Sequence, residues 1–548
     1  MADRERRRSI VLLAWIGAGT LLVAGIVEVQ LAYGLSGADD AWFLQVVDRV
    51  RGGDALYGEV QFGATPLAVW VALPPVAVFG AKLVVFKTLV SICAVASALV
   101  ASRVAAQVGL GPAGQALVAV SSIAYLPLPG LDLYNPLSYL FLLLALSAVL
   151  AWQARLADTV PARQGLPLAA ALVAAGVAAG LCFAAKQNVG LLALAALMGA
   201  VLWSSTGGRD LARRAKDMAV ALGAFAVAVA LPLIPVLLSG AFDDFAVSAF
   251  EKSRYVRYGS ISFLDGLDSL AGFARDPFGQ LRSLAEYAVF GLPLLAFAGL
   301  VAGWIRADRE RALTLGLFAA AAFAGIFPRA EIYHLGFSVP ALAIAVGWSA
   351  SRIRPLIPRV AARGAVMALG CVLVLTAVDS LLVYPRQLVS DRGLSASALP
   401  NLEGTLVGQG FDDSALRVSE ELRRADMGAD RTFLLMPSAG LYYLLSGLEN
   451  PTRFDYPTVT TFGRSGQDEV IDAIERDWIQ RVCVGGYGGS TFGPLRPGML
   501  VRHVRERMHL VRRIGNRDDV PGYDGGCSLY TTERRSAVSR SSLPSAAR

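Results

Sequence analysis

Two adjacent aspartates, Asp39 and Asp40, follow the first long apolar stretch of this 548-residue chain. A carboxylate at a membrane boundary can act as a general base that takes the proton of an acceptor hydroxyl. The pair could also serve the fold, because Asp39 can cap a helix starting near Ala41, with Asp40 in its first turn. Capping accounts for only one of the two aspartates and does not exclude chemistry by the other. We predict that Asp39 acts as the general base and that Asp40 is the acidic residue beside it.

Cationic residues form the second candidate group. They come from the segments FAAKQNVG, FEKSRYVRYGS and FPRAEIYHLG, which separate apolar stretches. The cations are Lys186, Arg254, Arg257, Arg329 and His334, with Lys252 beside them. In an apolar setting such a group favours a lipid phosphate or pyrophosphate, since Arg matches phosphate oxygens in a bidentate geometry. We therefore predict that this group binds the phosphate of a lipid-linked donor.

The cations also have ordinary structural explanations. Lys186 could reach the lipid headgroups with its long side chain. Arg254 and Arg257 could bind anionic headgroups without specificity. Arg329 and Glu331 could form a surface ion pair that contributes little. All of these explanations would have to hold together at one face of the membrane, whereas one anion site accounts for the whole group.

Further polar residues complete the candidate site. Those predicted to contact donor or acceptor are Asp132, Tyr134, Asn135, Tyr258 and Glu331. Asn135 precedes a proline and could be only a turn and helix cap, and His334 could cap the helix that follows it. A divalent cation, Mg or Mn, is left open. A histidine-based metal site is disfavoured, because the chain has three histidines and neither a CxxC nor an HExxH motif.

The composition places these residues in a membrane protein. The chain is 55% hydrophobic and 17% charged, whereas a soluble protein carries about 25% charged residues. Apolar stretches close to the roughly 20 residues that span a bilayer recur along the chain. We predict eleven spans, at residues 9–30, 83–106, 114–131, 136–154, 167–184, 189–204, 217–239, 284–304, 312–327, 334–350 and 364–384. The net charge of +7 reflects basic loops, and no nucleic-acid-binding patch is indicated.

Basic loops give the predicted orientation in the plasma (inner) membrane. The positive-inside rule makes the basic segments cytoplasmic, and these are the N-terminus and residues 102–107, 155–163, 207–216, 305–311 and 351–363. They share one side only if the short apolar stretch 66–80, with Pro74-Pro75 at its centre, does not cross. We therefore expect 66–80 to form an interfacial or re-entrant helix of the first outer loop, residues 34–82. Both candidate groups then face outward.

The remainder of the chain reads as a small soluble domain. SALRVSEELRRAD predicts a helix, and RTFLLMP, QRVCVGG and CSLYTTE predict strands. We predict a membrane module over 1–384, an extracytoplasmic α/β domain over 385–535 and a disordered end over 536–548. Cys483 and Cys527 lie on predicted strands, and spacing alone leaves their pairing open.

The stretch DDAWFLQVVDRVRGGDALYGEVQFGATPLAVWVALPPVAVFG resembles the opening of GT-C fold glycosyltransferases. That group includes the protein O-mannosyltransferases and the aminoarabinose transferases of lipid A. The shared pattern begins with the acidic pair and an amphipathic helix over 41–52. It continues with Gly53-Asp54 and Tyr57, an apolar helix that begins with Pro66-Leu67, and Phe79-Gly80. The segments FAAKQNVGLL, FPRAEIYHLGFSVPAL and LMPSAGLYYLLSGLENPTRFDY are also similar to parts of this group.

The resemblance implies a helical polytopic GT-C fold that takes sugar from a polyprenyl-phosphate donor with inversion at the anomeric carbon. Two positions depart from the family pattern. Asp40 stands where Glu is common, and either Asn135 or Asp132 stands where the second outer loop often has an acidic residue. A metal bridged by two acidic loops is therefore not implied.

The function hypothesis is a membrane glycosyltransferase acting on a hydroxyl of a glycan, lipid or protein. The main alternative is a polytopic transporter or flippase for a lipid or glycolipid. Transporters often carry internal repeats, and none is convincing here. A non-catalytic membrane anchor with a sensor tail is the third possibility, but it would not need the cations.

Overall fold

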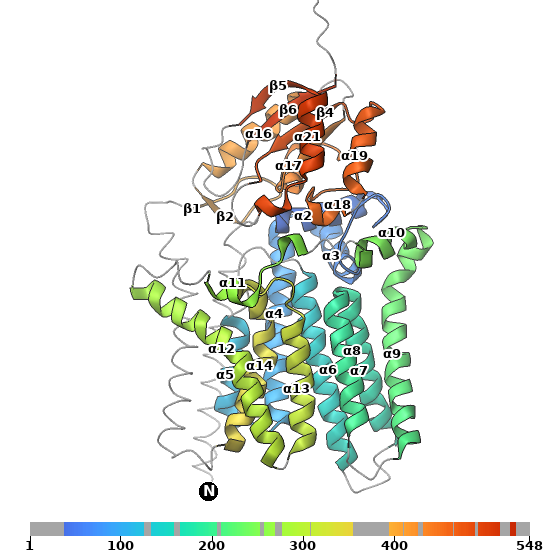
Figure 1. The fold of residues 1–548 in the computed structure, drawn as a ribbon, viewed down its shortest axis with the longest axis vertical. Helices are drawn as coiled ribbons and strands as arrows, with labels where there is room; N and C mark the ends of the chain where they lie inside the picture. The colour runs from blue at the N-terminus through green and yellow to red at the C-terminus, as the bar shows by residue number, and fades with distance from the viewer. Residues whose placement is uncertain are drawn as a thin grey trace, which may run out of the picture.

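The computed structural model describes residues 38–124, 133–157, 165–204, 210–251, 257–268, 277–306, 308–353, 394–408, 410–425, 431–463, 465–487, 492–515 and 526–532. A bundle of helices carries a smaller α/β unit on one end (Figure 1). The predicted spans 9–30 and 364–384, the predicted domain boundary at residue 384 and the predicted disordered end lie outside the described residues.

Nine of the predicted spans form helices within these ranges. They are α4 Leu83–Gln107, α5 Pro112–Ala124, α6 Tyr134–Ala157, α7 Gly165–Ala185, α8 Gln187–Trp203, α9 Leu211–Leu238, α12 Pro277–Arg306, α13 Arg309–Ala324 and α14 Ile332–Ile353. Among the described residues, six helices are long and apolar enough to cross a membrane. An α-helix satisfies its own backbone hydrogen bonds, which is what a segment in lipid requires.

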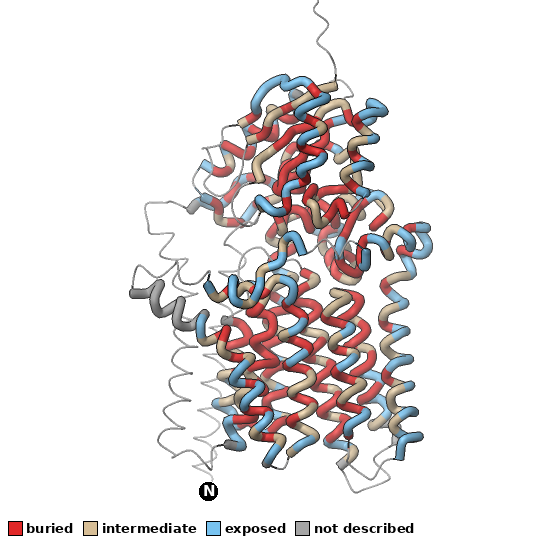
Figure 2. The backbone as a smooth tube through the Cα atoms, viewed as in Figure 1, coloured by how far each residue is buried: buried red, intermediate tan, exposed pale blue. Residues whose placement is uncertain are grey.

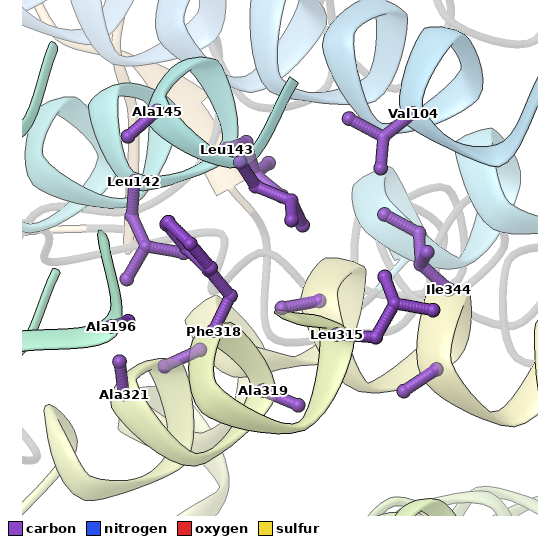
Figure 3. Close-up of a cluster of buried hydrophobic side chains, with 14 of the residues drawn as sticks. Val104, Leu142, Leu143, Ala145, Ala196, Leu315, Phe318, Ala319, Ala321 and Ile344 are labelled. Carbon is purple, nitrogen blue, oxygen red and sulfur yellow. The ribbon is translucent and has the colours of Figure 1, made fainter. Parts of the chain in front are cut away.

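The bundle is held together by small and branched apolar side chains. Leu142 and Leu143 of α6 lie against Leu315 and Phe318 of α13, with Ile344 of α14 beside them (Figure 3). Figure 2 shows buried residues in the middle of the bundle, while α9 and the coloured part of α12 carry many exposed residues among intermediate and buried ones. Exposed apolar side chains on those two helices fit a surface that faces lipid.

Glycines bring α7 and α9 into close contact. A Cβ on Gly176 would lie 2.2 Å from the Ala221 carbonyl oxygen, and one on Gly180 would lie 2.6 Å from the Phe225 carbonyl oxygen. Residues without side chains at this four-residue spacing let two helix backbones approach closely.

Short helices gather at the end of the bundle next to the α/β unit (Figure 1). They are α2 Asp39–Gly52, α3 Leu67–Phe79, α10 Phe242–Ala246, the π-helix η2 Val247–Glu251 and α11 Phe263–Asp268. The 13 residues of α3 extend about 20 Å, less than the about 30 Å of a bilayer core. This length supports the prediction that 66–80 does not cross. The described parts of the basic segments lie at one end of α4, α6, α9, α12, α13 and α14, and these helix ends are at the opposite end of the bundle (Figure 1).

The α/β unit, called the tail domain below, is built on a four-stranded sheet of order β3-β4-β6-β5. The strands are β3 Thr432–Leu435, β4 Arg481–Gly485, β5 His509–Ile514 and β6 Cys527–Thr531. β3 and β4 are parallel, and β6 is antiparallel to both of its neighbours. The three predicted strands and the predicted helix, α16 Phe411–Ala425, are confirmed. Strand β5 was not predicted.

Smaller elements complete the tail domain. They are a hairpin of β1 Leu394–Ala396 and β2 Leu406–Gly408, the helices α17 Ala439–Ser446, α18 Val459–Phe462, α19 Gly466–Glu475 and α21 Gly498–Arg507, and a 3-10 turn, η5 Gly493–Leu495. A disulfide joins Cys483 on β4 to Cys527 on β6. The pairing that the sequence leaves open is therefore formed.

Candidate active site

The acidic pair lies in the first turn of α2. The helix begins at Asp39, and the Trp42 N–H donates to the Ala38 carbonyl oxygen at 3.1 Å. Ala38 is therefore the capping position, and the alternative explanation, that Asp39 caps a helix starting near Ala41, does not hold because the helix starts earlier. Both carboxylates lie where the helix dipole favours negative charge. The Asp40 residue is 1% exposed, whereas Asp39 is partly exposed.

Lys87 accompanies Asp40 at this end of the bundle. It lies in α4, is 6% exposed, and its ammonium interacts electrostatically with the Asp40 carboxylate. The rings of Phe43 and Phe86, 5.1 Å apart, hold α2 against α4 at this point. Lys87 is not among the predicted site residues, although a lone lysine inside an apolar span is itself a signal. Because Lys87 offsets the charge of Asp40, the two aspartates differ in environment.

The helix α2 is covered on more than one side. All of residues 40–47 are buried. An amphipathic helix with one face open at the membrane surface is therefore only a partial description of α2. The tail domain covers the second face, and Tyr456 stacks on Trp42 with ring centroids 5.4 Å apart. The side chain of Arg49 is only 14% exposed.

The predicted cation Lys186 occupies a one-residue break between two helices. α7 ends at Ala185 and α8 begins at Gln187, with Lys186 in an extended conformation between them. A Cβ on Gly190 would lie 2.1 Å from Cα of Phe183, so only glycine fits where the two helices separate. This tight turn fixes the direction in which the lysine leaves the backbone.

The Lys186 ammonium donates a hydrogen bond to Oδ1 of Asn135 at 2.6 Å and lies 5.8 Å from the centre of the Tyr134 ring. Asn135 is 3% exposed and lies inside α6, so the alternative explanation, that it is only a turn or cap, does not hold. Its side chain instead accepts a hydrogen bond from Lys186, which lies 51 residues later in the chain. The acceptor is neutral, and this hydrogen bond therefore does not neutralise the lysine charge.

Arg329, Glu331 and His334 form one cluster. The Arg329 Nε donates to Oε1 of Glu331 at 3.0 Å, and Nδ1 of His334 lies 3.1 Å from the same oxygen. Arg329 and Glu331 do form an ion pair, but it is partly buried and not the surface pair of the alternative explanation. His334 lies within the first turn of α14 rather than ahead of it, so the alternative explanation, that it caps this helix, does not hold. The Lys186 ammonium repels the charged form of His334, so this cluster lies near the α7–α8 turn.

Glu331 is held in its charged form. Burial by itself would raise the pKa of this carboxyl, but the hydrogen bond with His334 and the charge of Arg329 outweigh it, so the pKa is lowered from its ordinary 4.5. The carboxylate therefore orients both basic side chains at neutral pH.

Arg257 and Tyr258 lie on a segment that pairs with the Arg329 loop. The Ile261 N–H donates to the Pro328 carbonyl oxygen and the Ala330 N–H donates to the Ile261 carbonyl oxygen, each at 3.0 Å. Arg257 and Tyr258 are exposed, with the guanidinium 5.2 Å from the ring centre. Three predicted residues lie outside the described ranges, namely Asp132, Lys252 and Arg254.

The first outer loop connects the acidic and cationic groups. Thr65 Oγ1 donates to the Phe183 carbonyl oxygen, and Gln187 Nε2 donates to the Gly63 carbonyl oxygen at 3.2 Å. The Phe62 ring lies 6.1 Å from that of Tyr134 and 5.7 Å from that of Trp42. The loop that begins with the aspartates therefore packs directly on the turn that carries Lys186.

The described residues do not assemble a metal centre. No group of three or more His, Cys, Asp or Glu side chains that could hold a metal ion occurs among them. Asp39 and Asp40 supply two carboxylates, and Mg²⁺ is commonly held by one or two carboxylates together with substrate phosphates. The divalent cation that the sequence leaves open therefore stays open.

Solved structures share this fold. Apo ArnT from Cupriavidus metallidurans matches with a TM-score of 0.58 and 14% identity, over 95% of this chain and 98% of that one. The same protein bound to undecaprenyl phosphate gives a TM-score of 0.56 and 15% identity, over 96% and 98%. No protein-family model and no curated protein matches the sequence.

A second solved protein is AglB, an oligosaccharyltransferase from Archaeoglobus fulgidus. Its complex with an inhibitory peptide and a dolichol-phosphate gives a TM-score of 0.53 and 11% identity, over 92% of this chain and 75% of that one. Another structure of this oligosaccharyltransferase contains Zn and sulfate, with a TM-score of 0.52, 12% identity and coverage of 91% and 73%. The chain therefore has the polytopic GT-C fold.

Proposed function

We propose that this protein is a membrane glycosyltransferase that moves a sugar from a polyprenyl-phosphate carrier to an acceptor hydroxyl. The observation that carries the proposal is the packing of the first outer loop, with its acidic pair, on the turn that carries Lys186. A base for a hydroxyl and a cation for a phosphate are the two groups that such a transfer needs.

Asp39 is the proposed general base. Its partial exposure favours contact with an acceptor, whereas Asp40 is buried and interacts with Lys87. As the acceptor oxygen bonds to the anomeric carbon with inversion, its proton passes to Asp39. The bond from that carbon to the phosphate oxygen breaks at the same time, and the phosphate leaves with the electron pair. Asp40 and Lys87 hold the first turn of α2 in place.

The cations are proposed to stabilise the departing phosphate. Lys186 donates a hydrogen bond to the neutral side chain of Asn135. The Arg329 and His334 side chains are oriented through Glu331, and Arg257, Arg254, Tyr258 and Asp132 are proposed to extend the site towards donor or acceptor. No step here is assigned to a metal. The lipid phosphates bound by ArnT and AglB support a polyprenyl-phosphate donor for this chain as well.

The proposed orientation has the tail domain outside the cytoplasm. The disulfide Cys483–Cys527 supports it, because such bonds persist in oxidising compartments. The basic segments at the opposite end of the bundle support it through the positive-inside rule.

The test uses purified full-length protein with a radiolabelled polyprenyl-phosphate sugar and envelope extract as acceptor. Asp39→Asn should lower transfer by about 10²- to 10⁴-fold, as expected for loss of a general base, while membrane insertion is unchanged. Wild-type transfer by this variant would contradict the base assignment. Mass spectrometry of envelope glycans from a deletion strain would identify the missing sugar and its linkage. Movement of labelled lipid across vesicles without a covalent product would favour a transporter instead.

A further inference from the structure

The tail domain contacts α2, the helix that carries the acidic pair, at three places along its length. Gly440 meets the start of the helix, Tyr456 meets its first half and Asp455 meets its second half. We call Gly440, Asp455 and Tyr456 the tail clamp. The three clamp residues follow α2 by more than 380 positions in the chain.

The strongest contact is a buried ion pair. Arg49 Nη1 donates to Oδ2 of Asp455 at 3.0 Å and to the Thr452 carbonyl oxygen at 2.9 Å. Its Nε donates to Asp54 at 2.7 Å and its Nη2 donates to the Glu59 carbonyl oxygen at 2.8 Å. The side chain of Asp455 is completely buried. One guanidinium thus ties the end of α2 to both the outer loop and the tail domain.

Gly440 makes the closest backbone approach. A Cβ at this position would lie 2.8 Å from Cα of Trp42 and 3.1 Å from the Ala41 carbonyl oxygen. The start of α17 therefore lies against the backbone that immediately follows Asp39 and Asp40. Tyr456 adds a stacked ring on Trp42, with an angle of 29° between the ring planes.

We propose that the tail clamp positions the general base, so that the tail domain is part of the catalytic apparatus rather than a cover over it. This inference rests on the proposed function. The clamp residues are positioning residues, since each acts through α2. All three clamp residues lie in the stretch Gly440–Tyr456. We therefore expect substitutions in this stretch to change the rate of the chemical step more than the binding of the donor.

The experiment combines two measurements on full-length protein in detergent. Hydrogen exchange of peptides covering 39–52 reports how firmly α2 is held, and kcat and donor KM report catalysis. Asp455→Ala should raise exchange in α2 at least about tenfold and lower kcat by about 10- to 100-fold, with donor KM within about twofold, since small misplacement of a catalytic group is costly.

The matched control is Glu403→Ala. Glu403 also pairs a tail residue with a cation of the first outer loop, Lys82, at 2.6 Å, but both side chains are exposed and such pairs contribute little. This variant should change neither measurement. Where Asp455→Ala does not fold, Tyr456→Ala carries the test, and Tyr456→Phe should restore both values because it keeps the stacked ring.

The two measurements separate this proposal from the proposed function. Unchanged exchange in α2 together with normal kcat would overturn the clamp. A rise in donor KM with unchanged kcat would also overturn it, because it would place the tail at the donor. If the wild type shows no sugar transfer but Asp455→Ala still raises hydrogen exchange in α2, the result supports the clamp contacts and contradicts the proposed glycosyltransferase function.

Discussion

The acidic and cationic halves of the candidate site are held in place by different parts of the molecule. The acidic half lies on α2, between the bundle below and the tail domain above, and Arg49 links it to Asp455. The cationic half lies on the α7–α8 turn and at the start of α14, where Lys186 donates to Asn135 of α6. One half therefore depends on contacts between domains, and the other depends on helix packing within the bundle.

This difference indicates that the two halves can be damaged separately. Changes in the bundle should affect the site for the departing phosphate and leave the tail domain folded. Changes in the tail domain should affect the position of the base and leave the cations in place. The predictions below test this separation, and they run from the largest expected effect to the smallest.

Gly190→Ala should be the most damaging single change. Its new Cβ would lie 2.1 to 2.4 Å from the Cα, N and Cβ of Phe183, and backbone cannot move aside as a flexible side chain can. We expect a loss of about 3 kcal/mol or more of stability and loss of sugar transfer. Thermal unfolding in detergent measures the first. The control is Gly223→Ala in α9, where nothing lies within 4 Å of the added carbon.

Lys186→Met tests the cationic half without disturbing the turn. Loss of a preorganised group that stabilises developing negative charge typically costs about 10²- to 10³-fold in kcat. We expect that loss, with unchanged exchange in α2 and unchanged unfolding of the tail domain. Lys82→Met removes an exposed lysine from the same face and should be neutral. Full activity of Lys186→Met would remove this residue from the phosphate site.

Removing the disulfide tests the tail half. Cys483 and Cys527 are separated by 44 residues, and closing a loop of this size contributes about 2 to 4 kcal/mol. The double change to serine should lower the unfolding temperature of the tail domain and spare the bundle. Reductant should have the same effect on the wild type and none on the double variant. An equal loss in bundle stability would show that the halves are not separable.

Patterns that are local in sequence predicted most of the fold. The length of apolar runs located nine helices, and the predicted strand segments matched β3, β4 and β6. Strand β5 escaped prediction because five of its six residues are exposed, so its sequence has no alternation of apolar and polar residues. Strand β5 is recognised as a strand from its antiparallel pairing with β6.

The candidate site was less predictable, because its contacts join distant segments. The Asn135-Pro136 dipeptide suggests a turn, yet a lysine 51 residues later determines what Asn135 does. The charge pattern of α2 suggests that Arg49 is solvated, yet its partner Asp455 lies 406 residues away. A sequence shows which residues are chemically capable, while such pairings appear only once the helices are packed.

Glu331→Gln sharpens the comparison within the cationic half and should have the smallest effect. The pKa of Glu331 is lowered from its ordinary 4.5, so the stability that it contributes is fully present above about pH 4.5 and is lost as the pH falls through the lower folded-state value. The stability of the wild type should exceed that of the variant by about 1 kcal/mol at pH 7, and the difference should shrink as the pH falls below 4.5. The Glu403→Gln control removes an exposed carboxylate whose ion pair with Lys82 is screened by solvent, so its difference should be much smaller. A difference in Glu331→Gln that does not shrink as the pH falls would mean that packing, and not charge, orients Arg329 and His334.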